Sequence, residues 1–156
     1  MAIPSVQETF ERGLDYLKRN RIQEASNAFR QAIKTDPDNP QFLSYYGLVL
    51  ALGEQNFQDA INFCRAALLK AAYEPALYIN LCKVYSKAGQ RKKALETLLE
   101  GLHYDRGNLL LIQEMRRMGC RRKPLLGFLS RDHFLNRVLG RFTHELGRNG
   151  RLKKSH

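Results

Sequence analysis

The feature that most constrains the fold is an internal repeat with a period of 34 or 35 residues. Small residues recur at this interval in three series, and a bulky residue follows two of the series at a fixed offset of three or four positions. A period of this length indicates a stack of similar units rather than one unique core. The small residues are Gly13, Gly47 and Cys82; Ala25, Ala60 and Ala94; and Ala32, Ala67 and Gly101.

Each unit is predicted to be a pair of helices joined by a turn. In the first unit Phe10, Leu14 and Leu17 have the spacing of one helix face, and the same period resumes after a polar turn. Pro40 and Pro75 are predicted to lie in the first turn of a helix, where the missing N–H costs nothing. An Ala or Gly at each helix crossing lets the two backbones approach closely, and the bulky residue beside it fills the groove.

The second unit departs from strict periodicity, because it contains one extra residue between Gly47 and Ala60. Gly53 and Gly89 are predicted to close the first helices of units two and three, where a left-handed residue is favoured. After the third unit, apolar residues at helical spacing predict one more helix, whose apolar stripe is Leu109, Ile112, Met115 and Met118.

These units resemble the tetratricopeptide repeat, in which a Gly or Ala is followed by Tyr, Ala, Phe, Ala and Pro. Unit two has Leu50 and Cys64 at the two bulky positions, and unit three has Cys82 and Gly101 at two small positions. The resemblance covers residues 5–106. It implies an all-α fold, an α-solenoid of helix–turn–helix repeats in a right-handed superhelix. The first unit matches the pattern throughout, at Gly13, Tyr16, Ala25, Phe29, Ala32 and Pro37.

Two segments are therefore expected, a repeat array at residues 5–119 and a basic, amphipathic helical extension at 120–156. An open end of a repeat array needs a solvated cap, which the helix after the third unit would provide. Within the array, the repeats and the capping helix are expected at about 6–38, 40–73, 75–106 and 107–118.

The resemblance implies that a peptide or protein segment binds in the concave groove lined by the first helix of each repeat. The groove is expected to be apolar in its first half and basic in its second. Some family members clamp a terminal carboxylate, but of the corresponding residues here only Asn80 has a suitable polar type. The candidate groove residues are Phe10, Leu14, Lys18, Tyr45, Leu48, Asn80, Lys83 and Lys87.

The net charge of +11 is concentrated in the C-terminal quarter, since residues 115–156 hold 12 Lys or Arg and only 2 Asp or Glu. Within it, an apolar stripe opposite arginines predicts a helix that docks on the repeats, on a second copy, on a partner or on a membrane surface. Clustered cations are also the footprint of nucleic-acid binding. The basic candidates in this extension are Arg121, Arg122, Lys123, Arg137, Arg141 and Arg148.

No constellation for catalysis, metal or cofactor binding is found in the sequence. It has no Gly-rich phosphate loop, its four histidines form no i, i+4 pair, and its three cysteines are scattered. Scattered cysteines, no apolar run long enough to span a membrane and no secretory signal favour the cytoplasm. The resemblance implies a non-enzymatic scaffold for protein–protein interaction, and with no such constellation in the sequence we expect no cofactor. Binding of nucleic acid or an anionic membrane through the extension, and a small secretion-type chaperone, remain alternatives.

Overall fold

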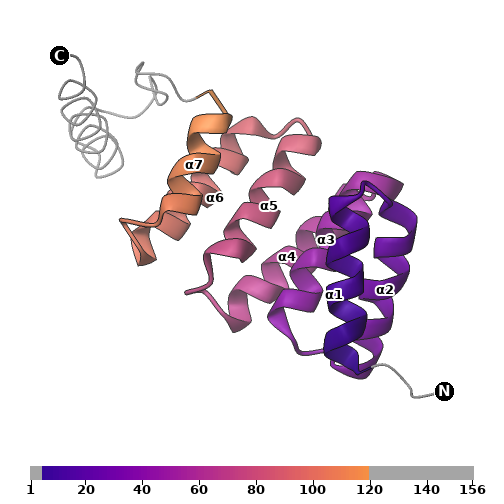
Figure 1. Cartoon of the computed structure of the whole chain (residues 1–156). Helices are drawn as coiled ribbons and strands as arrows, with labels where there is room; N and C mark the ends of the chain where they lie inside the picture. Colours follow the sequence, from indigo (N-terminus) through magenta and orange to yellow (C-terminus); the bar gives the residue numbers. More distant parts are fainter. Residues whose placement is uncertain (1–4, 120–156) are drawn as a thin grey trace, which may run out of the picture. The chain divides into compact units, whose positions relative to one another are not determined.

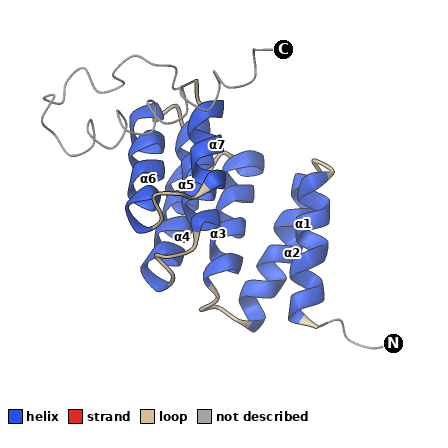
Figure 2. Ribbon diagram, turned by 60° about the vertical axis from the view of Figure 1, so that its left-hand side comes forward, coloured by secondary structure: helices blue, strands red, loops and turns tan. Residues whose placement is uncertain are grey.

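The computed structural model describes residues 5–119, and every regular element in that range is helical (Figures 1 and 2). Six helices form three hairpins, in each of which two helices pack against each other. Contacts divide the chain into two units, residues 1–114 and 115–156, and the three hairpins belong to the first. The hairpins are α1 (Val6–Lys18) with α2 (Ile22–Thr35), α3 (Pro40–Val49) with α4 (Phe57–Lys70), and α5 (Pro75–Lys87) with α6 (Arg91–Tyr104).

The starts of the first helices follow from local sequence. Ser5 caps α1 in a reciprocal capping box, in which its hydroxyl accepts from the backbone N–H of Glu8 and the Glu8 carboxylate accepts from the backbone N–H of Ser5. The Asn39 side chain caps α3. Pro40 and Pro75 each occupy the first turn of a helix, which confirms the sequence prediction.

The repeated small residues lie at the helix crossings, as predicted. Ala25, Ala60 and Ala94 have no exposed surface. A Cβ atom added at Gly13 would lie 2.5 Å from the Phe29 ring, so even an alanine would force that ring to move. The all-α solenoid expected from the repeat is therefore built on close approach of the two helices in each hairpin.

The extra residue of the second hairpin is absorbed by a π-helix, η1 (Leu50–Glu54), which continues α3. A π turn accommodates one residue more than an α turn. In successive hairpins a left-handed residue follows the first helix: Asn20, Gln55 and Gly89. Each stands five positions before the repeated alanine of the second helix, which is Ala25, Ala60 or Ala94. Gly89 therefore has the predicted left-handed backbone.

The same prediction is wrong for Gly53, because the left-handed residue is Gln55. The left-handed residue stands seven positions after the small residue of the first helix in the other hairpins, and the extra residue in η1 makes this eight positions after Gly47. Gly53 instead lies inside η1 and faces Ile22, whose Cγ2 would be 3.0 Å from an added Cβ. The glycine at this position provides room for the neighbouring hairpin rather than a left-handed turn.

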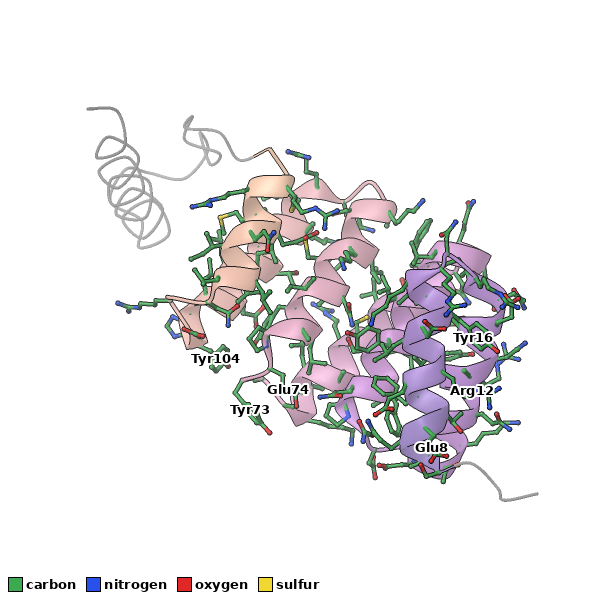
Figure 3. All side chains as sticks on the ribbon, viewed as in Figure 1. Glu8, Arg12, Tyr16, Tyr73, Glu74 and Tyr104 are labelled. Carbon is green, nitrogen blue, oxygen red and sulfur yellow. The ribbon has the colours of Figure 1, made fainter. Side chains whose placement is uncertain are left out.

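The outer face of α1 is polar where later hairpins are apolar. Glu8, Arg12 and Tyr16 lie one above another along α1 (Figure 3). Units of a solenoid stack through their apolar faces, and an end unit needs a polar outer face. The helix α1 therefore has the composition of an array end. At the equivalent positions the second and third hairpins have Phe42, Tyr46 and Leu50, then Leu77, Leu81 and Tyr85.

The helix expected after the third hairpin is α7 (Leu109–Arg117). Its predicted apolar stripe is wrong in part, because Leu109 is 79% exposed and Leu111 is fully buried. The repeat explains the difference, since Leu111 and Met115 stand 34 residues after Leu77 and Leu81, and all four are buried. The buried side of α7 is therefore predicted by its alignment with the preceding repeats and not by the spacing of apolar residues within α7 alone.

Candidate functional site

The first helices of the three hairpins lie side by side. A ring of α1 contacts a ring of α3, and α3 is joined to α5 by a side-chain hydrogen bond. We call the surface of α1, α3 and α5 that the sequence predicts to form the groove the first-helix face. Three kinds of environment occur along it: an aromatic cluster, a buried polar contact and a row of lysines.

The aromatic cluster fills the space between α1 and α3. The Phe10 ring centroid lies 4.8 Å from that of Phe42 and 5.5 Å from those of Phe29 and Tyr45. Phe10 is only 3% exposed, and half-burial of Tyr45 raises the pKa of its hydroxyl. Because the rings pack at these distances, no space remains between them for the carboxylate of a ligand, and none of them carries a positive charge to bind it. Of the positions that clamp a terminal carboxylate in some family members, Phe10 therefore belongs to the core of this protein, and Tyr45 is half-buried against it.

The buried polar contact lies between α3 and α5. Asn80 Nδ2 donates to the Ser44 hydroxyl over 3.0 Å, and both residues are buried. The Cys64 thiol donates to the Ser44 carbonyl over 3.5 Å, and burial raises the pKa of that thiol to about 12. A thiol with so high a pKa is not a nucleophile at neutral pH. Asn80 and Cys64 therefore hold the helices together rather than face a ligand.

The row of lysines lies on α5. Lys83 is half-buried and Lys87 is exposed, and the spacing of four residues places them on one side of the helix one turn apart. The half-buried Ile79 precedes them by one more turn. Neither lysine forms an ion pair with any residue that the structure describes. They are unneutralised cations beside an apolar side chain.

The remaining predicted groove residues divide in the same way. Leu48 is buried within α3, and Leu14 is half-buried against the aromatic cluster. Lys18 is exposed at the end of α1. Of the eight predicted residues, Phe10, Leu48 and Asn80 are therefore core residues, and surface for a ligand comes mainly from Tyr45, Lys18, Lys83 and Lys87, with Leu14 contributing its exposed part.

Two exposed tyrosines and a half-buried glutamate, which the sequence analysis missed, lie where α5 begins and α6 ends. Figure 3 shows Tyr73, Glu74 and Tyr104 gathered there, and we call these three residues the tyrosine rim. Tyr73 is 75% exposed and Tyr104 is 57% exposed. Their positions in the preceding repeat hold Asp38 and Lys70. A comparison of loop positions between repeats would have found this change from charge to ring.

Other predicted features either fall outside the described residues or have no counterpart within them. The basic candidates of the extension belong to residues 120–156, outside the described range. Residues 5–119 contain no cluster of His, Cys, Asp and Glu side chains arranged to hold a metal ion. None of the helices in that range combines the length and the apolar character that a membrane span requires. The tail residues concerned are Arg121, Arg122, Lys123, Arg137, Arg141 and Arg148.

Comparison with known proteins decides the family. Two family models described as tetratricopeptide repeat match the chain, one at residues 10–76 and the other at residues 51–117. Together they cover all three hairpins and α7. The chain belongs to the tetratricopeptide repeat family. Its fold class and its character as a helical-repeat scaffold follow from that membership.

One curated relative and two solved structures show the range of the similarity. U-box domain-containing protein 70 of Oryza sativa subsp. japonica is 30% identical over 136 residues, covering 83% of this chain but only 16% of that protein. The first TPR domain of Spaghetti (RPAP3), solved with the HSP90 peptide SRMEEVD, has a TM-score of 0.60 at 18% identity and covers 73% of this chain and 92% of that one. The TPR2B domain of yeast Sti1, solved as a complex with pHsp70, has a TM-score of 0.59 at 22% identity and covers 73% of this chain and 95% of that one. At these identities the two structures establish the fold.

Proposed function

We propose that this tetratricopeptide repeat protein is a non-enzymatic scaffold that binds an acidic, partly apolar segment of another protein on its first-helix face. The single observation behind the proposal is the row formed by Ile79, Lys83 and Lys87, two cations without ion-pair partners in the described range beside an apolar contact. Two of the structural relatives were solved as complexes, one with an HSP90 peptide and the other with pHsp70, which supports the same use of the fold.

The bound segment would contribute acidic side chains rather than a free terminal carboxylate. The clamp positions on α1 and α3 hold Phe10, Leu14 and Tyr45, none of which carries a positive charge. Asn80 keeps a polar type, but its amide already donates to Ser44. The lysines available to a ligand stand further along α5, one turn apart, where side-chain carboxylates of an internal segment would reach both.

A pair of charge reversals tests the proposal. Peptides are selected on the full-length protein from a random 12-residue display library, and their affinities are measured by fluorescence anisotropy. We expect Lys83→Glu with Lys87→Glu to weaken the selected peptides by about tenfold or more. The matched control is Lys34→Glu with Arg65→Glu, two exposed cations on the second helices, which changes the net charge equally and should leave affinity unchanged.

Two results would contradict the proposal. Equal loss of affinity in the test and control variants would mean that only net charge matters. Binding that survives both reversals but is lost when Arg137, Arg141 and Arg148 are changed to Glu would favour a site in residues 120–156, as the nucleic-acid and membrane alternatives require. A cytoplasmic location is part of the proposal. It is supported by Cys64 and Cys82, which are buried and form no disulfide within residues 5–119.

A further inference from the structure

The tyrosine rim differs from its counterpart in the preceding repeat. There, Lys70 Nζ and Asp38 Oδ1 form an ion pair over 2.7 Å, which joins the end of α4 to the loop before α3. In the next repeat Tyr104 and Tyr73 occupy the two equivalent positions, and both are more than half exposed. The fold therefore accommodates a polar pair at this place. Tyr104 contacts the Tyr78 ring at 6.2 Å between centroids, but more than half of its surface remains exposed.

The rim is continuous with the first-helix face. Gln41, at the start of α3, donates its side-chain N–H to the Glu74 carboxylate over 3.3 Å. Glu74 is the residue immediately before α5, and Lys83 and Lys87 belong to the last turns of the same helix. A segment that lies along α5 would thus meet a carboxylate and tyrosines at one end and lysines at the other.

The rim has the chemistry of a cation-binding surface. Tyrosine faces attract ammonium and guanidinium groups, and a neighbouring carboxylate strengthens the attraction. The protein uses the same contact internally, where Arg21 lies over the Tyr16 ring at 4.8 Å and Lys93 over the Tyr85 ring at 5.8 Å. Tyr73 and Tyr104 present comparable rings to solvent, with Glu74 between them in sequence and beside them in Figure 3.

We infer that the tyrosine rim binds an arginine or lysine side chain of the same segment that Lys83 and Lys87 bind through its acidic residues. This inference rests on the proposed function and adds a direction to it. The 13 residues of α5 are about 20 Å long at 1.5 Å per residue. An extended segment spans that length with about six residues, so the acidic and basic groups of the ligand should be about four to six residues apart.

Sequencing of selected peptides tests whether the rim binds the basic residue of the ligand. A random 12-residue display library is selected on the full-length protein and on the Tyr73→Ala, Tyr104→Ala double variant. Peptides selected on the parent protein should be enriched in acidic residues and should also contain an Arg or Lys four to six positions away from them, on either side. On the double variant the acidic residues should remain and the basic residue should no longer be enriched.

Affinity measurements complete the test. The double variant should bind a selected peptide of mixed charge about tenfold more weakly, and an analogue with Ala in place of its basic residue should bind both proteins equally. Glu74→Gln, which keeps a side-chain acceptor for Gln41, should also weaken only the peptide of mixed charge. Leu69→Ala is the matched control, because Leu69 is a 90% exposed apolar residue outside the rim.

The failure of this inference is distinguishable from failure of the proposed function. Selected peptides that depend on Lys83 and Lys87 but contain no enriched basic residue would overturn the rim inference alone. Selected peptides that ignore both lysines would overturn the proposed function and the inference together. A full-length protein that sediments as a dimer, and becomes monomeric in the Tyr73→Ala, Tyr104→Ala variant, would assign the rim to a second copy and overturn the inference.

Discussion

The two junctions between repeats use different chemistry in their interiors. At the first junction, aromatic rings from three helices pack together, with Phe10 between Phe29 and Phe42. At the second junction, a buried hydrogen bond from Asn80 to Ser44 joins α3 to α5 beside an aliphatic cluster that contains Leu43 and Leu77. The bulky position of the second helix shows the same contrast, because Phe29 in the first hairpin corresponds to Cys64 in the second.

The junctions also differ at their surfaces, and the two differences have opposite consequences. The exposed ion pair of Lys70 with Asp38 joins the end of α4 to the loop before α3, whereas the equivalent positions of the next repeat expose Tyr104 and Tyr73. Aromatic packing at the first junction contributes stability and leaves little surface for a ligand. The second junction has aliphatic side chains and a polar pair in place of those rings, and it presents lysines and tyrosines to solvent. Stability and recognition are thus expected to reside mainly in different junctions.

The largest effect is expected from the first junction. Phe29→Ala would remove a fully buried ring that contacts Phe10 and Tyr45 and covers Gly13. We expect the free energy of unfolding to fall by about 3–5 kcal/mol, measured by urea denaturation. Phe29→Leu, which keeps most of the volume, should cost less than half of this. A loss below about 1 kcal/mol for the alanine variant would contradict the role given to the aromatic cluster.

A smaller loss is expected at the second junction. Asn80→Ala would leave the buried Ser44 hydroxyl without its donor and open a small cavity, which together should cost about 1–3 kcal/mol. Replacing both partners with apolar residues, Ser44→Ala with Asn80→Leu, should recover most of that loss, because no buried polar group is then left unpaired. A double-mutant cycle measures the coupling. Strictly additive losses would show that the hydrogen bond does not join the two helices.

Alkaline pH should weaken the second hairpin through Cys64. Burial raises the pKa of this thiol from 9.0 to about 12, so between these values the folded protein keeps a proton that the unfolded chain has released. The contribution of Cys64 to stability is therefore constant below about pH 9 and falls as the pH rises towards 12, by at most about 1.4 kcal/mol per pH unit. Urea denaturation at several pH values should give a shallower decline for Cys64→Ala. Parallel declines for the two proteins would rule out Cys64 as the cause.

Much of the fold could be predicted from sequence because the same pattern of residues occurs in all three repeats. The alanines at the crossings, the prolines at helix starts and the helix after the third hairpin all follow from residues that recur at one interval. The extra residue of the second hairpin was visible as well, but its placement was not. Whether a helix absorbs an insertion in a π turn or in its loop depends on the packing on both sides, so Gly53 was predicted in a role that Gln55 has.

The candidate site was less predictable for a different reason. Matching to a family identifies the helix face on which ligands bind, but it does not show whether neighbouring side chains fill the space there. Phe10, Leu48 and Asn80 are on the predicted helices and are nevertheless buried, because rings and a hydrogen bond from adjacent helices cover them. The tyrosine rim was missed because its residues stand at loop and helix-end positions, where the repeat pattern specifies little.

The smallest effect on stability, and the sharpest test of the comparison, comes from giving the second junction the surface of the first. Tyr73→Asp with Tyr104→Lys would place at these positions the residue types that form the ion pair of Lys70 with Asp38. Exposed ion pairs contribute about 0–1 kcal/mol, and the two tyrosines are more than half exposed, so the free energy of unfolding should change by less than about 1 kcal/mol.

Binding should nevertheless change, because the rings that would hold a cation are gone and a lysine stands in their place. A selected peptide of mixed charge should therefore bind this variant more weakly at unchanged thermal stability. The reciprocal change, Asp38→Tyr with Lys70→Tyr, is the matched control and should leave peptide affinity as it was. A large loss of stability in the first variant would mean that the tyrosines pack as part of the fold, and that the separation of stability from recognition between the two junctions is wrong.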